Sequence, residues 1–133
     1  MYMNRKWEII FYKDVEGFCP VDEFLETLSE KDKTEMNAWI NFLGNVGFDA
    51  RRPQADYLRD GIHELRVKLS RGGTRTLYFF CYGDYIVLTN PFYKRTDKVP
   101  DSEINKALKY KQDFLNRYSK ENIGKANANS NTN

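Results

Sequence analysis

Residues 62–94 read IHELRVKLSRGGTRTLYFFCYGDYIVLTNPFYK, and they carry the signals of three consecutive β-strands. Apolar and polar side chains alternate in the first strand, which places Arg66 on its polar face. The glycine pair at 72–73 predicts a hairpin, because glycine adopts the positive φ of tight turns. Residues 83–84 predict a second turn, and Pro91 indicates an edge position, a bulge or the end of the last strand. The stretch therefore predicts an antiparallel meander.

The flanking sequence predicts one further strand and three helices. Residues 6–12 are rich in β-formers and predict a first strand. Helices are predicted over 20–29, over 32–46, where apolar residues recur at three- and four-residue steps, and over 101–117. Residues 48–60 are expected to form a polar loop. The resulting order, β-α-α-β-β-β-α, predicts an α+β fold with a mainly antiparallel twisted sheet and helices packed on one side.

Length and composition favour one folded domain. The chain has 133 residues, of which 41% are hydrophobic. We expect a single domain over 1–120 and a disordered polar tail over 121–133. No apolar run approaches the roughly 20 residues of a membrane helix, and the first residues lack the features of a signal peptide. A cytoplasmic protein without a membrane partner is therefore expected, with Cys19 and Cys81 as free thiols. A single histidine and no metal-ligand spacing predict neither a metal nor another cofactor.

The charges are segregated along the chain although the net charge is only +2. Residues 1–50 hold 5 Lys or Arg and 10 Asp or Glu, residues 51–98 hold 10 and 5, and residues 99–133 hold 6 and 4. A local positive field can exist at such a small net charge, and it would attract a polyanion. Acidic helices lying against basic strands would give the same asymmetry.

Cations are predicted to converge on one side of the sheet. They lie on the polar face of the first strand of the meander, near the start of the second and at the end of the third: Arg66, Lys68, Arg75, Lys94 and Arg95. Such groups suit a phosphodiester, whose ground state and transition state are both anionic, and nearby aromatic rings could stack on unpaired bases. Each also has a structural interpretation: Arg66 as a partner of Glu64, the others as solvated charges, Tyr93 and His63 as packing residues.

Other catalytic signatures are missing from the sequence. There is no nucleophile elbow, phosphate-binding glycine loop, dinucleotide fingerprint or zinc-protease motif. No pair of carboxylates suggests a two-metal site. If the protein is a nuclease, metal-independent chemistry on RNA is favoured, because the 2′-hydroxyl supplies an internal nucleophile.

Three motifs together resemble the RelE/HigB toxin superfamily, in its phage-derived HigB-like branch. LRDGIHELR at 58–66 resembles the branch's L-x-D-G-I-x-E-L-R stretch, and RTLYFFCYGDYIVLTNPFYKRT at 75–96 resembles its following strand pair. KVPDSEINKA at 98–107 resembles the start of its next helix. The resemblance covers roughly residues 7–118 and is densest over 58–107.

This resemblance implies a RelE-like fold and the toxin of a type II toxin–antitoxin system. Such toxins are mRNA endoribonucleases that inhibit translation, typically on the ribosome, by metal-independent attack of the 2′-hydroxyl on the adjacent phosphate. A cognate antitoxin, expected to be a helix-turn-helix protein, neutralises them. Carried over by motif, Arg66 and Arg75 hold the phosphate, and Lys94 and Arg95 complete the charge.

The resemblance leaves the general base open, with Lys94, Tyr93 and His63 as hypotheses in that order. The remaining RNA-binding surface is predicted to include Lys68, Arg71, Lys98 and His63. Residues 89–91, TNP, depart from the family pattern, which keeps a degenerate toxin-fold interaction protein as an alternative. A non-catalytic RNA- or ribosome-binding module is the other.

Overall fold

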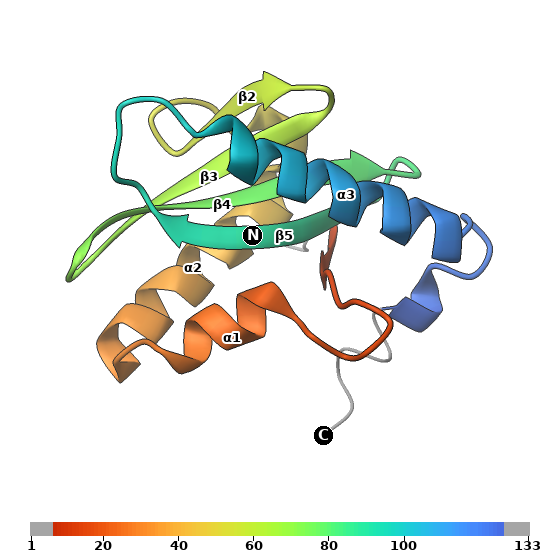
Figure 1. The fold of residues 1–133 in the computed structure, drawn as a ribbon, viewed down its shortest axis with the longest axis horizontal. Coiled ribbons are helices and arrows are strands. Elements are labelled where there is room, and N and C mark those ends of the chain that lie inside the picture. The colour runs from red at the N-terminus through yellow and green to blue at the C-terminus, as the bar shows by residue number, and fades with distance from the viewer. Residues whose placement is uncertain (1–6, 127–133) are drawn as a thin grey trace.

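A computed structural model describes residues 7–126, which form a five-stranded sheet with helices on both faces (Figure 1). The elements are β1 (Glu8–Phe11), α1 (Pro20–Glu26), α2 (Glu30–Val46), the 3-10 helix η1 (Gly47–Asp49), β2 (Ala55–Arg59), β3 (Ile62–Leu69), β4 (Gly72–Cys81), β5 (Tyr85–Tyr93) and α3 (Asp101–Arg117). The strand order is β1-β5-β4-β3-β2. Only the β1–β5 pair is parallel, so the predicted α+β class with a mainly antiparallel sheet is confirmed. Among the described helices, none is long and apolar enough to span a membrane.

The helices divide between the two faces of the sheet. On the first, here called the α2 face, Val21 of α1 and Met36 of α2 pack against Tyr78 of β4. On the opposite face, called the α3 face, Phe114 of α3 packs against Phe79. The predicted packing on one side holds for α1 and α2, whereas α3 covers the other face. Burial of β4 on both faces explains why its sequence alternates poorly.

A short strand occupies part of the predicted loop at 48–60. β2 pairs with β3 in an antiparallel register in which Asp56 faces Glu64 and Tyr57 faces His63. β2 is the edge strand of the sheet, and of its residues only Ala55 is buried. An edge strand this short shows no apolar alternation, which is why the sequence pattern indicated a loop.

A bulge in β5 confirms one of the predictions made for Pro91. Thr76 pairs with Pro91 and Tyr78 with Leu88, so β5 spends one residue more than β4 between these pairs. The bulge is anchored by Asn90, which is 4% exposed and donates through Nδ2 to the backbone oxygen and the carboxylate of Glu103. The TNP segment therefore joins β5 to the first turn of α3.

The segment after α3 closes the core, which corrects the prediction of a disordered tail for residues 121–126. Ile123 and Ala126 are buried in the same cluster as Phe114. Two small or aliphatic side chains suffice to cover the end of this cluster. The prediction of disorder was based on the low apolar content of the whole tail, which two such residues hardly change. The rest of the predicted tail, 127–133, lies outside the described residues.

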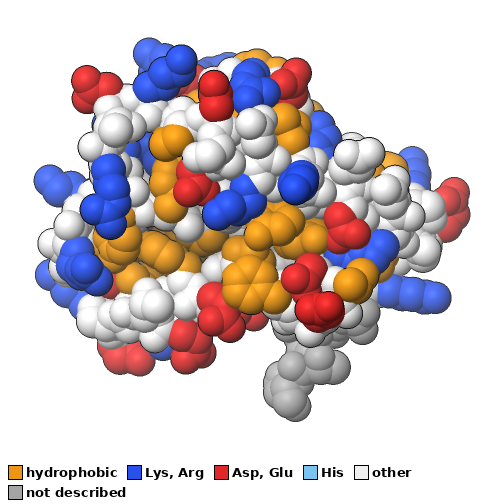
Figure 2. All heavy atoms as spheres, viewed as in Figure 1, with side chains coloured by type: hydrophobic (Ala, Val, Ile, Leu, Met, Phe, Trp, Pro, Cys, Tyr) orange, Lys and Arg blue, Asp and Glu red, His pale blue; other side chains and the backbone are white. Residues whose placement is uncertain are grey.

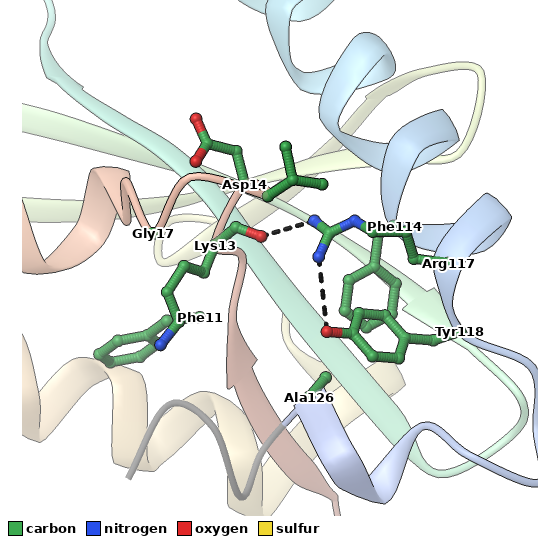
Figure 3. A pocket seen from close by; sticks show the side chains of 9 residues that line it. Phe11, Lys13, Asp14, Gly17, Phe114, Arg117, Tyr118 and Ala126 are labelled. Atoms are coloured by element: carbon green, nitrogen blue, oxygen red, sulfur yellow. Dashed lines mark hydrogen bonds between the residues drawn. The ribbon is translucent and has the colours of Figure 1, made fainter. Parts of the chain in front are cut away.

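Arg117 fastens the end of α3 to the loop after β1 (Figure 3). Its Nη2 donates to the Lys13 backbone oxygen at 2.6 Å and to Asp113 Oδ2 at 2.7 Å. A cavity of about 360 Å³ beside it is lined by Arg117, Tyr118 and Ala126 among others. The hydrogen bonds from Arg117 and Tyr12 lower the pKa of the Asp113 carboxyl. Arg117 therefore stabilises the fold by joining α3 to the loop after β1.

Candidate nucleic-acid interface

The strand register gathers predicted cations on the α3 face. Arg66 pairs directly with Arg75 across β3 and β4, and Lys68 pairs with Gly73. The backbone N–H of Lys94 donates to Gly73 O at 2.9 Å, which continues the ladder beyond β5. Figure 2, which views the α3 face, shows Lys and Arg side chains gathered on its left, where the β3–β4 hairpin and the loop after β5 lie.

The β5 bulge decides which residue joins this group. Leu88 and Pro91 both pair with α2-face residues of β4, and Tyr93 pairs with Thr74 on that same face. Phe92 pairs with Arg75 and packs against the α3-face cluster, so Lys94 follows on the α3 face. If side chains alternated strictly from Leu88 onward, Tyr93 would lie on the α3 face and Lys94 on the α2 face. The extra residue therefore places Lys94 on the same face as the arginines and Tyr93 on the opposite face.

A buried carboxylate holds the two arginines. Glu64 is 3% exposed, and its Oε2 accepts hydrogen bonds from Nε and Nη2 of Arg66 at 3.1 and 2.9 Å. Its Oε1 lies 3.0 Å from Nε of Arg75, an ion pair without hydrogen-bond geometry. Burial lowers the pKa of the Arg75 guanidinium, an effect that Glu64 opposes. Glu64, Arg66 and Arg75, here called the arginine unit, thus carry one net positive charge in a fixed arrangement.

The ion pairs continue from the arginine unit to the edge of the sheet. Asp56 Oδ2 lies 3.5 Å from Nη2 of Arg66 and 2.8 Å from Nη2 of Arg52. The hydrogen bond from Arg52 is the largest of the effects that lower the pKa of the Asp56 carboxyl. Asp56 and Arg52 were not predicted as site residues because β2 was not predicted as a strand. The two-residue spacing of Glu64 and Arg66 places both on one face of β3 and indicates an ion pair between them. A carboxylate on a neighbouring strand could extend that ion pair.

A shallow cavity of about 450 Å³ opens beside the arginine unit. It is lined by Arg66, Lys68 and Arg75 together with Trp39 and Gln54 from outside the sheet. Trp39 is half-buried, packs against the α2-face cluster and donates through Nε1 to Glu35 at 3.0 Å. β2 pairs with β3 as far as Leu65, and the Arg66 backbone N–H donates to Gln54 O at 2.8 Å. β2 does not extend along the edge of β3 beyond Arg66, and α2 borders that part of the strand. An indole beside guanidinium groups offers a stacking surface for a base.

Tyr93 and Arg71 pack with each other instead of with the arginine unit. The Tyr93 ring lies 5.4 Å from the ring of Phe24, and the guanidinium carbon of Arg71 lies 5.4 Å from the Tyr93 centroid. Arg95 lines a separate cavity of about 470 Å³ with Tyr93, and Lys98 is exposed in the same loop. In the part of the chain that the structure describes, neither Arg95 nor Lys98 makes a hydrogen bond or an ion pair with the arginine unit.

His63 also lies on the α2 face. Its ring stacks on Tyr78 with centroids 5.2 Å apart, and its edge contacts are with Tyr57 and Phe80. Burial lowers the pKa of His63, and the positive charge of Lys111 lowers it further. Of the three hypotheses for the general base, the structure brings Lys94 alone to the face of the arginine unit. Within residues 7–126, no three His, Cys, Asp or Glu residues are placed to hold a metal ion.

The chain matches a known protein family over most of its length. Residues 23–112 match the family described as Phage derived protein Gp49-like (DUF891), a span that runs from α1 into α3 and contains every member of the ion-pair network. The match covers more than half of the chain, so the protein belongs to this phage-derived family, which is associated with RelE/HigB-like toxins. No curated protein matches the chain.

Proposed function

We propose that this protein is the toxin of a type II toxin–antitoxin pair and cleaves mRNA on the ribosome without a metal ion. The observation that carries the proposal is the arginine unit, in which the buried Glu64 fixes Arg66 and Arg75 side by side on an open part of the sheet. Preorganised guanidinium groups stabilise the charge that grows on a phosphodiester during cleavage. Membership of a family associated with RelE/HigB-like toxins supports the same reaction.

The chemistry follows from the substrate's own hydroxyl group. The 2′-oxygen attacks the adjacent phosphorus, the bond to the 5′-oxygen breaks, and a 2′,3′-cyclic phosphate and a 5′-hydroxyl result. One proton leaves the 2′-oxygen and one reaches the 5′-oxygen. Arg66 and Arg75 would bind the non-bridging oxygens. Lys94 is the candidate for moving a proton, because an amine can give up and take back a proton whereas a guanidinium group is a poor proton donor. A cognate antitoxin in the same cytoplasm would neutralise the toxin by covering this face.

Expression in bacteria tests the proposal. Wild type, Arg75→Ala, Arg75→Lys and the exposed control Lys109→Ala are produced from a tightly repressed promoter, and growth and mRNA 5′ ends are recorded. We expect arrest and new 5′ ends for wild type and Lys109→Ala, and neither for Arg75→Ala. Arg75→Lys keeps a charge near Glu64 and so separates loss of the phosphate contact from loss of folding. Intact messages in cells that contain folded wild-type protein would refute the nuclease.

A second candidate is an RNA- or ribosome-binding module that does not cleave. It is favoured by the position of Tyr93 and His63 on the α2 face, which leaves Lys94 as the one predicted proton-transfer group beside the arginine unit. In a nuclease, Lys94→Ala loses cleavage while most of the RNA affinity remains. In a binding module, the same substitution lowers affinity and its salt dependence, and no cleavage exists to lose.

A further inference from the structure

A further cavity lies on the α2 face beside the edge strand β2. It has a volume of about 530 Å³, and the residues that line it include five with rings: Phe48, Tyr57, His63, Tyr78 and Phe80. Phe48 comes from η1, Tyr57 from β2, His63 from β3 and the last two from β4. Four elements thus place rings around one space.

Two of these rings are held open to solvent. Phe48 is 61% exposed and Tyr57 is 55% exposed, although both are large hydrophobic side chains. Phe48 is fixed from behind by Trp7, with centroids 4.8 Å apart, and by Phe80 at 4.1 Å. The Tyr57 hydroxyl accepts a hydrogen bond from the Gly61 backbone N–H at 3.1 Å. Exposed aromatic faces kept in position are what a flat ligand needs for stacking.

The cavity also contains an uncommitted polar group. Within residues 7–126, the His63 ring packs against aromatic rings, and its nitrogens make no hydrogen bond. Burial lowers the pKa of His63, which favours the neutral imidazole with one donor and one acceptor. A nucleobase edge presents donors and acceptors that such a ring can pair with.

Charged side chains on the lining of the cavity lead to the arginine unit. Arg51, Arg52 and Asp56 line the cavity, which gives one net positive charge, and Arg51 makes no ion pair with any described residue. Arg52 contacts Asp56 at 2.8 Å, and Asp56 lies 3.5 Å from Arg66 on the other side of the edge strand. The net positive charge complements a phosphate backbone, so a strand of RNA fits better than an apolar peptide.

We propose that the cavity between Phe48, Tyr57 and His63 binds one unpaired nucleobase of RNA, whose sugar–phosphate backbone crosses the β2 edge to the arginine unit. The inference deepens the proposed function and rests on its RNA substrate. Cleavage itself is not required, because the base would bind equally in a nuclease and in a binding module.

The test uses the full chain and a single-stranded 2′-O-methyl oligoribonucleotide that contains 2-aminopurine. The methyl group removes the nucleophile, so binding is measured without cleavage. Wild type should quench the 2-aminopurine fluorescence. Tyr57→Ala and Phe48→Ala should each weaken binding about tenfold and lose the quenching, because base stacking on one ring is removed. Tyr57→Phe keeps the ring and should keep the quenching, and Phe18→Ala, an exposed ring on another loop, serves as the control.

Each outcome bears on the proposal separately from the nuclease. Wild-type affinity and quenching in both alanine variants would overturn it, and so would a wild type that binds no oligonucleotide, which would point to a protein partner for this surface. Quenching that depends on Tyr57 in a protein that leaves cellular mRNA intact would support the base site and refute the nuclease. Cleavage in cells that Tyr57→Ala and Phe48→Ala leave unchanged would support the nuclease and refute the base site.

Discussion

The two faces of strand β3 are stabilised in different ways, although the residues concerned, His63 and Glu64, are neighbours in the sequence. On the α3 face, Glu64 is a carboxylate almost removed from solvent, and it is stabilised by ion pairs with Arg66 and Arg75. On the α2 face, His63 is half-buried among aromatic rings, and it makes no ion pair with any residue between 7 and 126. One face therefore depends on charge, while the other depends on stacking.

Because the two faces are stabilised differently, they should be disturbed by different substitutions. A buried carboxylate is destabilising without its partners, so the arginine unit should respond strongly to loss of charge. Aromatic packing is indifferent to salt, so the α2 face should respond to loss of ring area instead. Asp56 and Arg52 connect the two faces at the sheet edge.

The largest expected effect is on the charged face. Glu64→Gln removes the carboxylate partner of Arg75 and leaves Arg66 with Asp56, whose Oδ2 is 3.5 Å away, and we expect it to lower the free energy of unfolding by about 2–4 kcal/mol. Urea denaturation measures this, with the exposed Glu26→Gln as the matched control. Unchanged stability in Glu64→Gln would mean that the arginine unit does not depend on its carboxylate.

Salt dependence sharpens the comparison in binding. Arg66→Ala should weaken binding of a single-stranded oligoribonucleotide and reduce the slope of log affinity against log salt by about one, because one phosphate contact is lost. Tyr57→Ala should weaken binding about tenfold with the slope unchanged, because stacking releases no counterions. Titrations at several salt concentrations measure both. Equal slopes in the two variants would contradict the division between the faces.

The connection at the sheet edge should be weaker. Arg52 is exposed and Asp56 is partly exposed, so a double-mutant cycle of Arg52→Ala and Asp56→Asn should give a coupling much smaller than the loss of stability in Glu64→Gln. The pKa of Asp56 is lowered from 3.8, so its ionised form is favoured by folding. The coupling should therefore persist down to pH 3.8 and be lost as the pH falls through the lowered pKa. A coupling that disappears above pH 4.5 would contradict this assignment.

The sequence predicted the large elements and part of the site, and its errors have physical causes. Alternation in 62–69 and helical periodicity in 32–46 and 101–117 are strong because each element buries a whole face. β2 was missed because an edge strand buries little, and Asp56 was missed with it. Tyr93 was grouped with the arginines because a bulge shifts alternation by one residue, and no local pattern fixed where that shift falls. The roles assigned to the site residues stay predictions.

The smallest expected effect concerns the pH response of His63. Its pKa is lowered from 6.5 in the folded chain, so protonation opposes folding. The resulting loss of stability should be absent above about pH 6.5 and should grow as the pH falls through the lowered pKa. Urea denaturation at pH 7.5 and 5.0 should therefore show a larger drop for wild type than for His63→Gln, which has no titrating ring. Other groups titrate in both proteins, so the difference between the two drops in stability is due to His63. Equal drops would show that protonation of His63 does not destabilise the aromatic face.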